Sequence, residues 1–221
     1  MDAGYTKYVA AAGLPALKKA VCKKFARENA LEYDPSQIVI SNGGKHAILN
    51  AVAAVVEEGD EVIIPSPYWL TYPEVVRFFG GVPVYVPTTR ENGFKMTAEQ
   101  LEAAITPKTA MLIFNSPCNP TGAVYSEEEI KAIAAVCEKH ELCVLSDEMY
   151  EKLIYDGLKH YSIAQVSPKM KELTILVNGV SKSYAMTGWR LGYLAASAPV
   201  AKAIGSFQSH ATSNVNTITQ Y

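Results

Sequence analysis

The chain has 221 residues, of which 49% are hydrophobic and 19% charged, a balance typical of a folded protein with one substantial core. Its formal net charge of −2 argues against a general affinity for nucleic acid or anionic membranes, so any anion-binding site must be local. The segment Met1–Leu14 lacks the apolar run of a signal peptide and no later stretch has the length of a membrane span, so we expect a cytoplasmic protein. The four cysteines and four histidines follow no spacing typical of a metal site, and we expect no metal.

Taken in chain order, short apolar runs rich in β-branched residues alternate with longer amphipathic stretches. Seven of these runs are predicted to be strands: Ile38–Ser41, Glu61–Ile64, Val82–Val86, Thr109–Phe114, Leu142–Ser146, Leu173–Asn178 and Leu191–Ala195. This alternation is typical of an α/β fold with a mostly parallel sheet.

The amphipathic stretches between the strands predict helices with recognisable starts. Three of them are Leu14–Ala30, Lys45–Glu57 and Trp69–Phe79. Pro73 is expected to interrupt the third helix near its beginning. Two further helices begin with the capping-box pattern, in which Thr97 is followed by Gln100 and Ser126 by Glu129.

Polar residues follow the carboxyl ends of the predicted strands, where open α/β sheets place their ligands. The first group is Asn42-Gly43-Gly44-Lys45, which leads into a helix whose free N–H groups favour an anion. Paired glycines before a helix also occur in ordinary tight turns. The segment matches neither the dinucleotide nor the nucleoside-triphosphate glycine fingerprint, so a nicotinamide dehydrogenase loses its main support.

Two more polar groups follow later strands. The segment from Asn115 to Gly122 contains two prolines, and Asn119 precedes the second of them. Asp147 begins the run Asp147-Glu148-Met149-Tyr150, and an aspartate at a buried strand end is often only a helix cap or an ion-pair partner. Neither group is specific by itself.

The segment from Gly179 to Gly192 is the most informative. It places Lys182 between small residues in a loop after an apolar strand, with Arg190 eight positions later at the start of the next strand. A lysine in a loop is usually a solvated charge. Apolar strands on both sides favour a partly buried amine here, and burial makes a lysine more reactive as a nucleophile.

At this point the sequence resembles the class I aminotransferases of fold type I, in particular the bacterial-type branch of the aspartate aminotransferase group. The segment from Gly179 to Gly192 agrees with that family's lysine signature, and Asn119-Pro120-Thr121-Gly122 and Asp147-Glu148-Met149-Tyr150 occur in the expected order and spacing. The resemblance runs from Tyr8 to the last residues. It implies a three-layer α/β/α large domain with a mostly parallel seven-stranded sheet and pyridoxal 5′-phosphate as cofactor.

The resemblance also implies catalytic roles for several residues. Lys182 would form the Schiff base with the cofactor aldehyde and then move a proton, while Asp147 would pair with the protonated ring nitrogen. Tyr150 and Asn119 would donate hydrogen bonds to the phenolate oxygen of the ring, and Trp69 would stack on its face.

The cofactor phosphate would be bound by Arg190, with Ser181 and the backbone around Gly43, Gly44 and Lys45 completing the site. Tyr8 matches a tyrosine that the neighbouring subunit contributes to this phosphate site, which implies a homodimer.

The substrates implied are an α-amino acid and a 2-oxo acid. Lys45 matches a position that helps to bind the distal carboxylate of acidic substrates in some members of the branch, which favours aspartate or a similar amino acid, although a solvated lysine at a helix start remains an alternative. Trp69 and Asn119 would also contact substrate.

The chain departs from a complete family member because the amino-terminal arm and the carboxyl-terminal small domain are absent. We therefore interpret residues 1–221 as the large domain of a longer protein, which by itself would not complete the reaction. Two alternatives retain the same cofactor contacts. One is a pyridoxal-phosphate-dependent carbon–sulfur lyase, and the other is a non-catalytic aminotransferase-like sensor domain.

Overall fold

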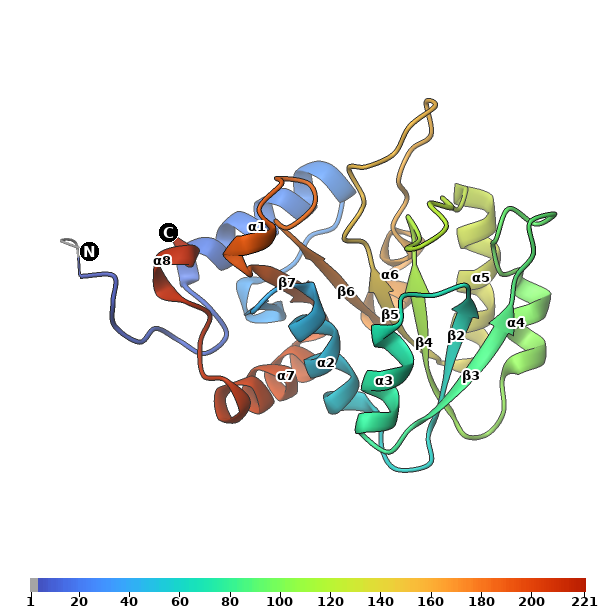
Figure 1. Ribbon diagram of the computed structural model, residues 1–221, viewed down its shortest axis with the longest axis horizontal. Helices are drawn as coiled ribbons and strands as arrows, with labels where there is room; N and C mark the ends of the chain where they lie inside the picture. Colours follow the sequence, from blue (N-terminus) through green and yellow to red (C-terminus); the bar gives the residue numbers. More distant parts are fainter. Residues whose placement is uncertain (1–3) are drawn as a thin grey trace.

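The computed structural model describes residues 4–221, which form one seven-stranded sheet covered by helices on both faces (Figure 1). The strands are β1 (Ile38–Ser41), β2 (Glu61–Ser66), β3 (Val82–Pro87), β4 (Thr109–Asn115), β5 (Cys143–Asp147), β6 (Thr174–Gly179) and β7 (Gly192–Ala195). All seven predicted strands are confirmed, with ends that differ from the predictions by at most two residues.

The order of the strands across the sheet is β1-β7-β6-β5-β4-β2-β3. Neighbours from β3 to β6 are parallel, whereas β7 runs antiparallel to both β1 and β6. The mostly parallel sheet is therefore confirmed. Because β7 alone is reversed, its first residue lies beside the last residues of β1 and β6, and Gly192 is paired with both Ser41 and Gly179. The loops after β1 and β6 and the loop that leads into β7 thus meet at one edge.

The helices are α1 (Pro15–Asn29), α2 (Gly44–Val55), α3 (Thr71–Phe78), α4 (Ala98–Ala104), α5 (Glu127–His140), α6 (Pro168–Leu173), α7 (Ala198–Ala211) and α8 (Thr217–Gln220), with short 3-10 turns at η1 (Pro35–Gln37), η2 (Ile163–Gln165) and η3 (Thr187–Trp189). The predicted helices at α1 and α2 are confirmed. The expected interruption of the third helix was wrong, because Pro73 lies in the first turn of α3. Backbone N–H groups in a first turn make no hydrogen bond within the helix, so a proline there removes none.

Two layers of apolar side chains attach the helices to the sheet. Helices α2, α3 and α7 pack on one face, where Ile48, Val76 and Ile204 meet strand residues such as Ile113. Helices α4, α5 and α6 cover the opposite face beneath β2 to β5, and α1 covers the same face beneath β1, β6 and β7. Alternate strand residues point toward opposite layers, as expected for a sheet buried on both sides.

Both predicted capping boxes are present. Gln100 N donates to Thr97 Oγ1 at 3.3 Å and Thr97 N donates back to Gln100 Oε1 at 3.0 Å, which fixes the start of α4. Ser126 and Glu129 make the same pair of bonds at the start of α5. None of the helices in residues 4–221 combines the length and the apolar character needed to span a lipid bilayer.

Candidate cofactor-binding site

A cavity of about 260 Å³ opens at the carboxyl edge of the sheet, where the loops after β1, β4, β5 and β6 meet. Its lining residues are Gly44, Lys45, Ile48, Trp69, Tyr72, Asn119, Asp147, Met149, Tyr150, Ser181, Lys182, Thr187 and Arg190. The chemistry of the site follows from how each element directs its polar side chain.

Asp147 is the last residue of β5, and the residue is only 4% exposed although it lines the cavity. Oδ1 accepts a bond from Met149 N at 3.1 Å, and Oδ2 accepts one from the Tyr72 hydroxyl at 2.8 Å. Burial raises the pKa of Asp147 to about 6, and the two hydrogen bonds only partly oppose that effect. A cation placed against this carboxylate would favour its charged form.

Tyr72 is a site residue that the sequence analysis missed. It lies on α3 and is buried, and burial followed by the negative charge of Asp147 raises the pKa of its hydroxyl well above the usual value. The phenol therefore stays protonated and donates to Asp147. Its position three residues after Trp69, one helical turn along the same segment, was the available signal.

The loop after β4 is fixed by an asparagine inside it. Asn115, which pairs with Asp147 in the sheet, donates through Nδ2 to the Asp147 carbonyl at 2.8 Å and accepts through Oδ1 from Asn119 N at 2.8 Å. The backbone positions of Asn119 and Asp147 are thereby linked by one side chain. Asn119 is half-buried at the cavity wall.

Lys182 lies in a tight turn after β6. Tyr184 N donates to the Val180 carbonyl at 3.2 Å, and Ala185 N donates to the Lys182 carbonyl at 3.1 Å. The side chain is half-buried and its Nζ lies 5.6 Å from the centre of the Tyr150 ring. Among the described residues, no carboxylate forms an ion pair with this amine. Lys182, Asp147 and Arg190 all line the same cavity.

Arg190 closes the 3-10 turn η3 in a left-handed conformation, with φ of 51°, just before β7. Its Nη1 donates to the Thr187 carbonyl at 2.9 Å, and no acidic side chain within residues 4–221 pairs with it. A Cβ on Gly43 would lie 2.4 Å from Nη2 of this guanidinium, so a side chain at that position would displace the arginine from where it lies. The residue also has φ of 85°, which a side chain would disfavour.

The first turn of α2 faces the same end of the cavity. Its N-cap, Gly43, provides no side chain to bond the free N–H groups, and Gly44 and Lys45 line the cavity directly after it. Gly192 lets β7 approach this turn closely, since a Cβ there would lie 2.4 Å from the Gly43 carbonyl carbon. Ser181, which is buried, lines the cavity as well. Together with Arg190 this end suits an anion such as a phosphate.

An aromatic wall completes the cavity. Trp69 packs edge-on against Tyr72 at a centroid distance of 5.5 Å, and Lys45 places Nζ 5.1 Å from the centre of the Trp69 ring. Lys45 is otherwise exposed and carries its positive charge at the mouth of the cavity.

The structure brings together most of the residues predicted from sequence. Nine line the cavity: Gly44, Lys45, Trp69, Asn119, Asp147, Tyr150, Ser181, Lys182 and Arg190. Gly43 lies directly behind Arg190, whereas the Tyr8 side chain is 88% exposed and does not line the cavity. Besides Tyr72, the sequence analysis missed Ile48, Met149 and Thr187, which carry no local signal that separates them from core or loop residues.

The donor set fits pyridoxal 5′-phosphate. A guanidinium and a helix amino terminus lie together in the cavity lining. Within residues 4–221, neither the buried carboxylate of Asp147 nor the amine of Lys182 forms an ion pair. This arrangement offers an anion site, a cation site and a nucleophile to one flat ring.

The strand order, the reversed β7 and the lysine-bearing loop before it define the large-domain fold of the fold type I transferases. The family description "Aminotransferase class I and II" matches residues 1–221, and the chain belongs to this family.

Individual relatives agree with the family assignment. The chain is 52% identical over its whole length to the aspartate aminotransferase of Geobacillus stearothermophilus and 50% identical to the aspartate/prephenate aminotransferase of Cereibacter sphaeroides, covering 56% of each. Among solved structures, it matches an aspartate aminotransferase from Rhizobium meliloti with a TM-score of 0.97 and 45% identity, over 99% of this chain and 55% of the other. An aromatic aminotransferase from Pyrococcus horikoshii matches with a TM-score of 0.97 and 42% identity, over 100% of this chain and 59% of the other. The chain thus spans about half the length of the curated relatives it matches.

Proposed function

We propose that this chain is the pyridoxal-phosphate-binding large domain of an aminotransferase that moves an amino group between an acidic α-amino acid, such as aspartate, and a 2-oxo acid. The observation that carries the proposal is that Lys182, Asp147 and Arg190 line one cavity at the carboxyl edge of the sheet. Because the chain spans about half of its relatives, the reaction is proposed for the whole protein.

When bound, pyridoxal phosphate supplies an aldehyde that exchanges amino groups and a cationic ring that accepts electrons. Arg190 binds the phosphate through a planar fork of N–H donors, and the free N–H groups at the start of α2 add further bonds. These contacts fix one end of the ring.

Asp147 holds the other end. An ionised carboxylate in a buried site binds a protonated ring nitrogen strongly. The Tyr72 hydroxyl favours the ionised form of Asp147 by donating a hydrogen bond to its Oδ2. Replacing Asp147 by alanine should therefore reduce turnover more than cofactor binding.

Lys182 would supply the nucleophilic amine and would move a proton at the substrate's Cα. The Tyr150 ring lies beside the lysine, which positions a phenol close to the reacting atoms. From the loop after β4, the Asn119 side chain would donate a hydrogen bond to the phenolate oxygen of the ring. Trp69 forms the apolar wall against which a flat ring would pack.

Substrate choice is assigned to Lys45. Its ammonium group stands over the Trp69 ring at the cavity mouth, where it would attract the distal carboxylate of an acidic substrate. The names of the two bacterial relatives, an aspartate and an aspartate/prephenate aminotransferase, support an acidic substrate.

The proposal extends to a cytoplasmic homodimer in which Tyr8 of one protomer reaches the phosphate site of the other. What supports this part is that Tyr8 is 88% exposed and does not line the cavity of its own chain.

The direct test is to mix the protein with pyridoxal phosphate, reduce with borohydride and locate the adduct by peptide mass. We expect the adduct on Lys182, no adduct at that peptide in Lys182→Ala, and an undiminished adduct in Lys45→Ala. An adduct on another lysine of the wild-type protein, or none, would overturn the mechanism. Product analysis on the whole protein then separates the reactions, because a lyase releases ammonia and pyruvate without an amino acceptor.

A further inference from the structure

Directly behind Asp147 lies a buried group of charged side chains that the proposed mechanism does not use. Asp147 and Glu148 are consecutive, and successive side chains of an extended segment point to opposite sides. Asp147 lines the cavity, while Glu148 is 1% exposed and does not line it. The second carboxylate is therefore buried on the far side of the same backbone.

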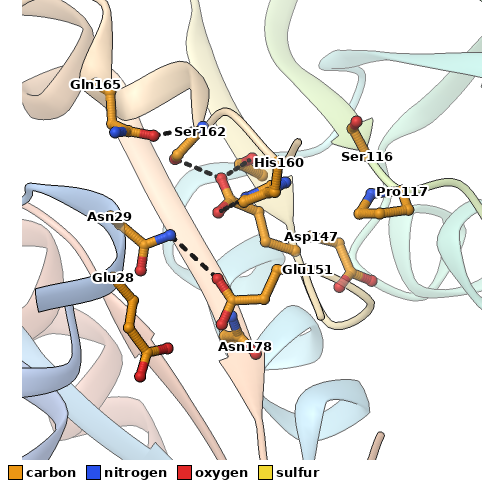
Figure 2. Close-up of polar contacts among 12 residues, drawn as sticks. Glu28, Asn29, Ser116, Pro117, Asp147, Glu151, His160, Ser162, Gln165 and Asn178 are labelled. Atoms are coloured by element: carbon orange, nitrogen blue, oxygen red, sulfur yellow. Dashed lines mark hydrogen bonds and ion pairs between the residues drawn. The ribbon is translucent and has the colours of Figure 1, made fainter. Parts of the chain in front are cut away.

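Glu148 is held by partners from two segments. Its Oε1 accepts from Ser146 Oγ at 2.9 Å and from Ser162 Oγ at 2.5 Å, and its Oε2 lies 2.7 Å from His160 Nε2. Figure 2 shows His160 and Ser162 side by side, each with a dashed contact. Both residues stand at the base of the loop that runs from β5 to η2 and projects from the sheet in Figure 1.

The protonation of this pair follows from its surroundings. Burial by itself would lower the pKa of His160, but the charge of Glu148 and the hydrogen bond to it outweigh burial and raise the pKa above its usual value. Burial likewise would raise the pKa of Glu148, yet His160 and the two serine hydroxyls hold it below its usual value. The favoured state is an imidazolium bound to a carboxylate.

A second buried acid stands nearby with a cation of its own. Glu151 forms an ion pair with Lys24 of α1 and accepts from Asn29 Nδ2 at 3.1 Å, a contact also drawn in Figure 2. Two buried tyrosines also face this group and stay neutral: burial, followed by the charge of Glu148, raises the pKa of Tyr33, and burial, followed by nearby carboxylates including Glu151 and Glu148, raises that of Tyr193. Lys24 is thus paired with Glu151 and, at 3.9 Å, with Glu28, and within residues 4–221 His160 is the cation that forms an ion pair with Glu148.

The same residues do not form a metal site. The ligand atoms of Glu148, Glu151 and His160 lie within 4.8 Å of one another. Lys24 and the imidazole already provide the positive charge that two carboxylates require, so a metal ion would have to displace both.

We propose that His160 is a positioning residue for Asp147: it neutralises the carboxylate of Glu148 and thereby keeps the adjacent Asp147 ionised and available to a cationic ring nitrogen. The role of this pair in catalysis rests on the proposed function, whereas its effect on the ionisation of Asp147 does not. Without His160, two buried carboxylates would follow one another in the chain with no cation paired to Glu148, and each would disfavour ionisation of the other.

The test uses the protein without cofactor. In wild type, the free energy of unfolding is compared with that of Asp147→Asn across a pH series, and the pH at which the difference develops reports the ionisation of Asp147. The comparison is repeated in His160→Gln, in the double variant Glu148→Gln/His160→Gln, and in the matched control His140→Gln. His140 makes the same kind of bond to a carboxylate, 2.8 Å from Glu102 Oε1, but on the protein surface.

We expect the ionisation of Asp147 to move to higher pH by roughly one unit in His160→Gln. It should stay at the wild-type value in His140→Gln and return to that value or below in the double variant, which removes both charges of the pair. A merely structural role for His160 would not be rescued by a second substitution. An unchanged or lower ionisation pH in His160→Gln, or no return in the double variant, would overturn the proposal.

A second measurement connects the pair to the cofactor. The affinity for pyridoxal phosphate at neutral pH should fall in His160→Gln and recover in the double variant, with His140→Gln unchanged. If wild type binds no pyridoxal phosphate, the proposed function fails while the pH series still decides the electrostatic claim. If wild type binds it and His160→Gln binds it equally well, the positioning role is refuted even though the cofactor assignment stands.

Discussion

Without cofactor, Asp147→Asn should be more stable than wild type at neutral pH, and this gain in the free energy of unfolding should disappear at acidic pH. Asp147 is buried, and the pKa of its carboxyl, about 6, lies above the ordinary value of 3.8. A raised pKa means that the folded state binds the proton more tightly than the unfolded state. The carboxyl therefore costs no stability below pH 3.8, and the cost grows as the pH rises and is complete above pH 6.

The size of the effect follows from the two pKa values. At about 1.4 kcal/mol per pH unit, the separation between them corresponds to a cost of about 3 kcal/mol above pH 7, roughly half of which has developed by pH 5. Asparagine has nearly the same shape and keeps an acceptor for the Tyr72 hydroxyl, so its own effect on stability should not depend on pH.

The assay is urea unfolding of both proteins at several pH values from 4 to 8. Charged groups that are common to both variants cancel in the difference, which leaves the contribution of Asp147. A difference that stays flat across this range, or that grows as the pH falls, would refute the claim that Asp147 is a buried carboxyl to which no cation of residues 4–221 is paired.

Two further substitutions test other parts of the site. Arg190→Lys should weaken the binding of pyridoxal phosphate about tenfold or more, as measured by calorimetry, because an ammonium group cannot reproduce the planar fork of donors. The control is Arg77→Lys, at an exposed arginine paired with Glu74, and it should leave the affinity unchanged. Equal affinities for the two variants would count against a phosphate contact at Arg190. Tyr72→Phe removes the donor to Oδ2 of Asp147, so the pH at which Asp147 ionises should rise in the unfolding assay, and an unchanged value would show that the hydroxyl contributes nothing to the carboxylate.

The order of strands and helices along the chain follows from local sequence. Apolar runs of four to six residues bounded by turn residues predicted the seven strands, because strands buried on both faces need uninterrupted apolar side chains, although the edge strand β3 is partly exposed. The capping boxes at Thr97 and Ser126 fixed two helix starts, because each satisfies free backbone groups within four consecutive residues. Pro73 was misjudged because its effect depends on which turn of the helix it occupies.

Local sequence also placed Lys182, Asp147 and Arg190 at or near strand ends, but their roles were predicted from the resemblance to the class I aminotransferases. It could not show that these strand ends share one cavity. That result depends on the order of strands across the sheet and on the reversal of β7, which brings Gly192 beside both Ser41 and Gly179.

Contacts between distant segments were decided only by the tertiary structure. Tyr72 donates to Asp147 from a helix 75 residues earlier in the chain. His160 contacts Glu148 because the two ends of the loop after β5 lie side by side. The sequence determined which elements form and which polar residues stand at their ends, since those outcomes depend on neighbours along the chain. The tertiary structure decided which charges are buried and which of them are paired, since burial and pairing depend on neighbours in space.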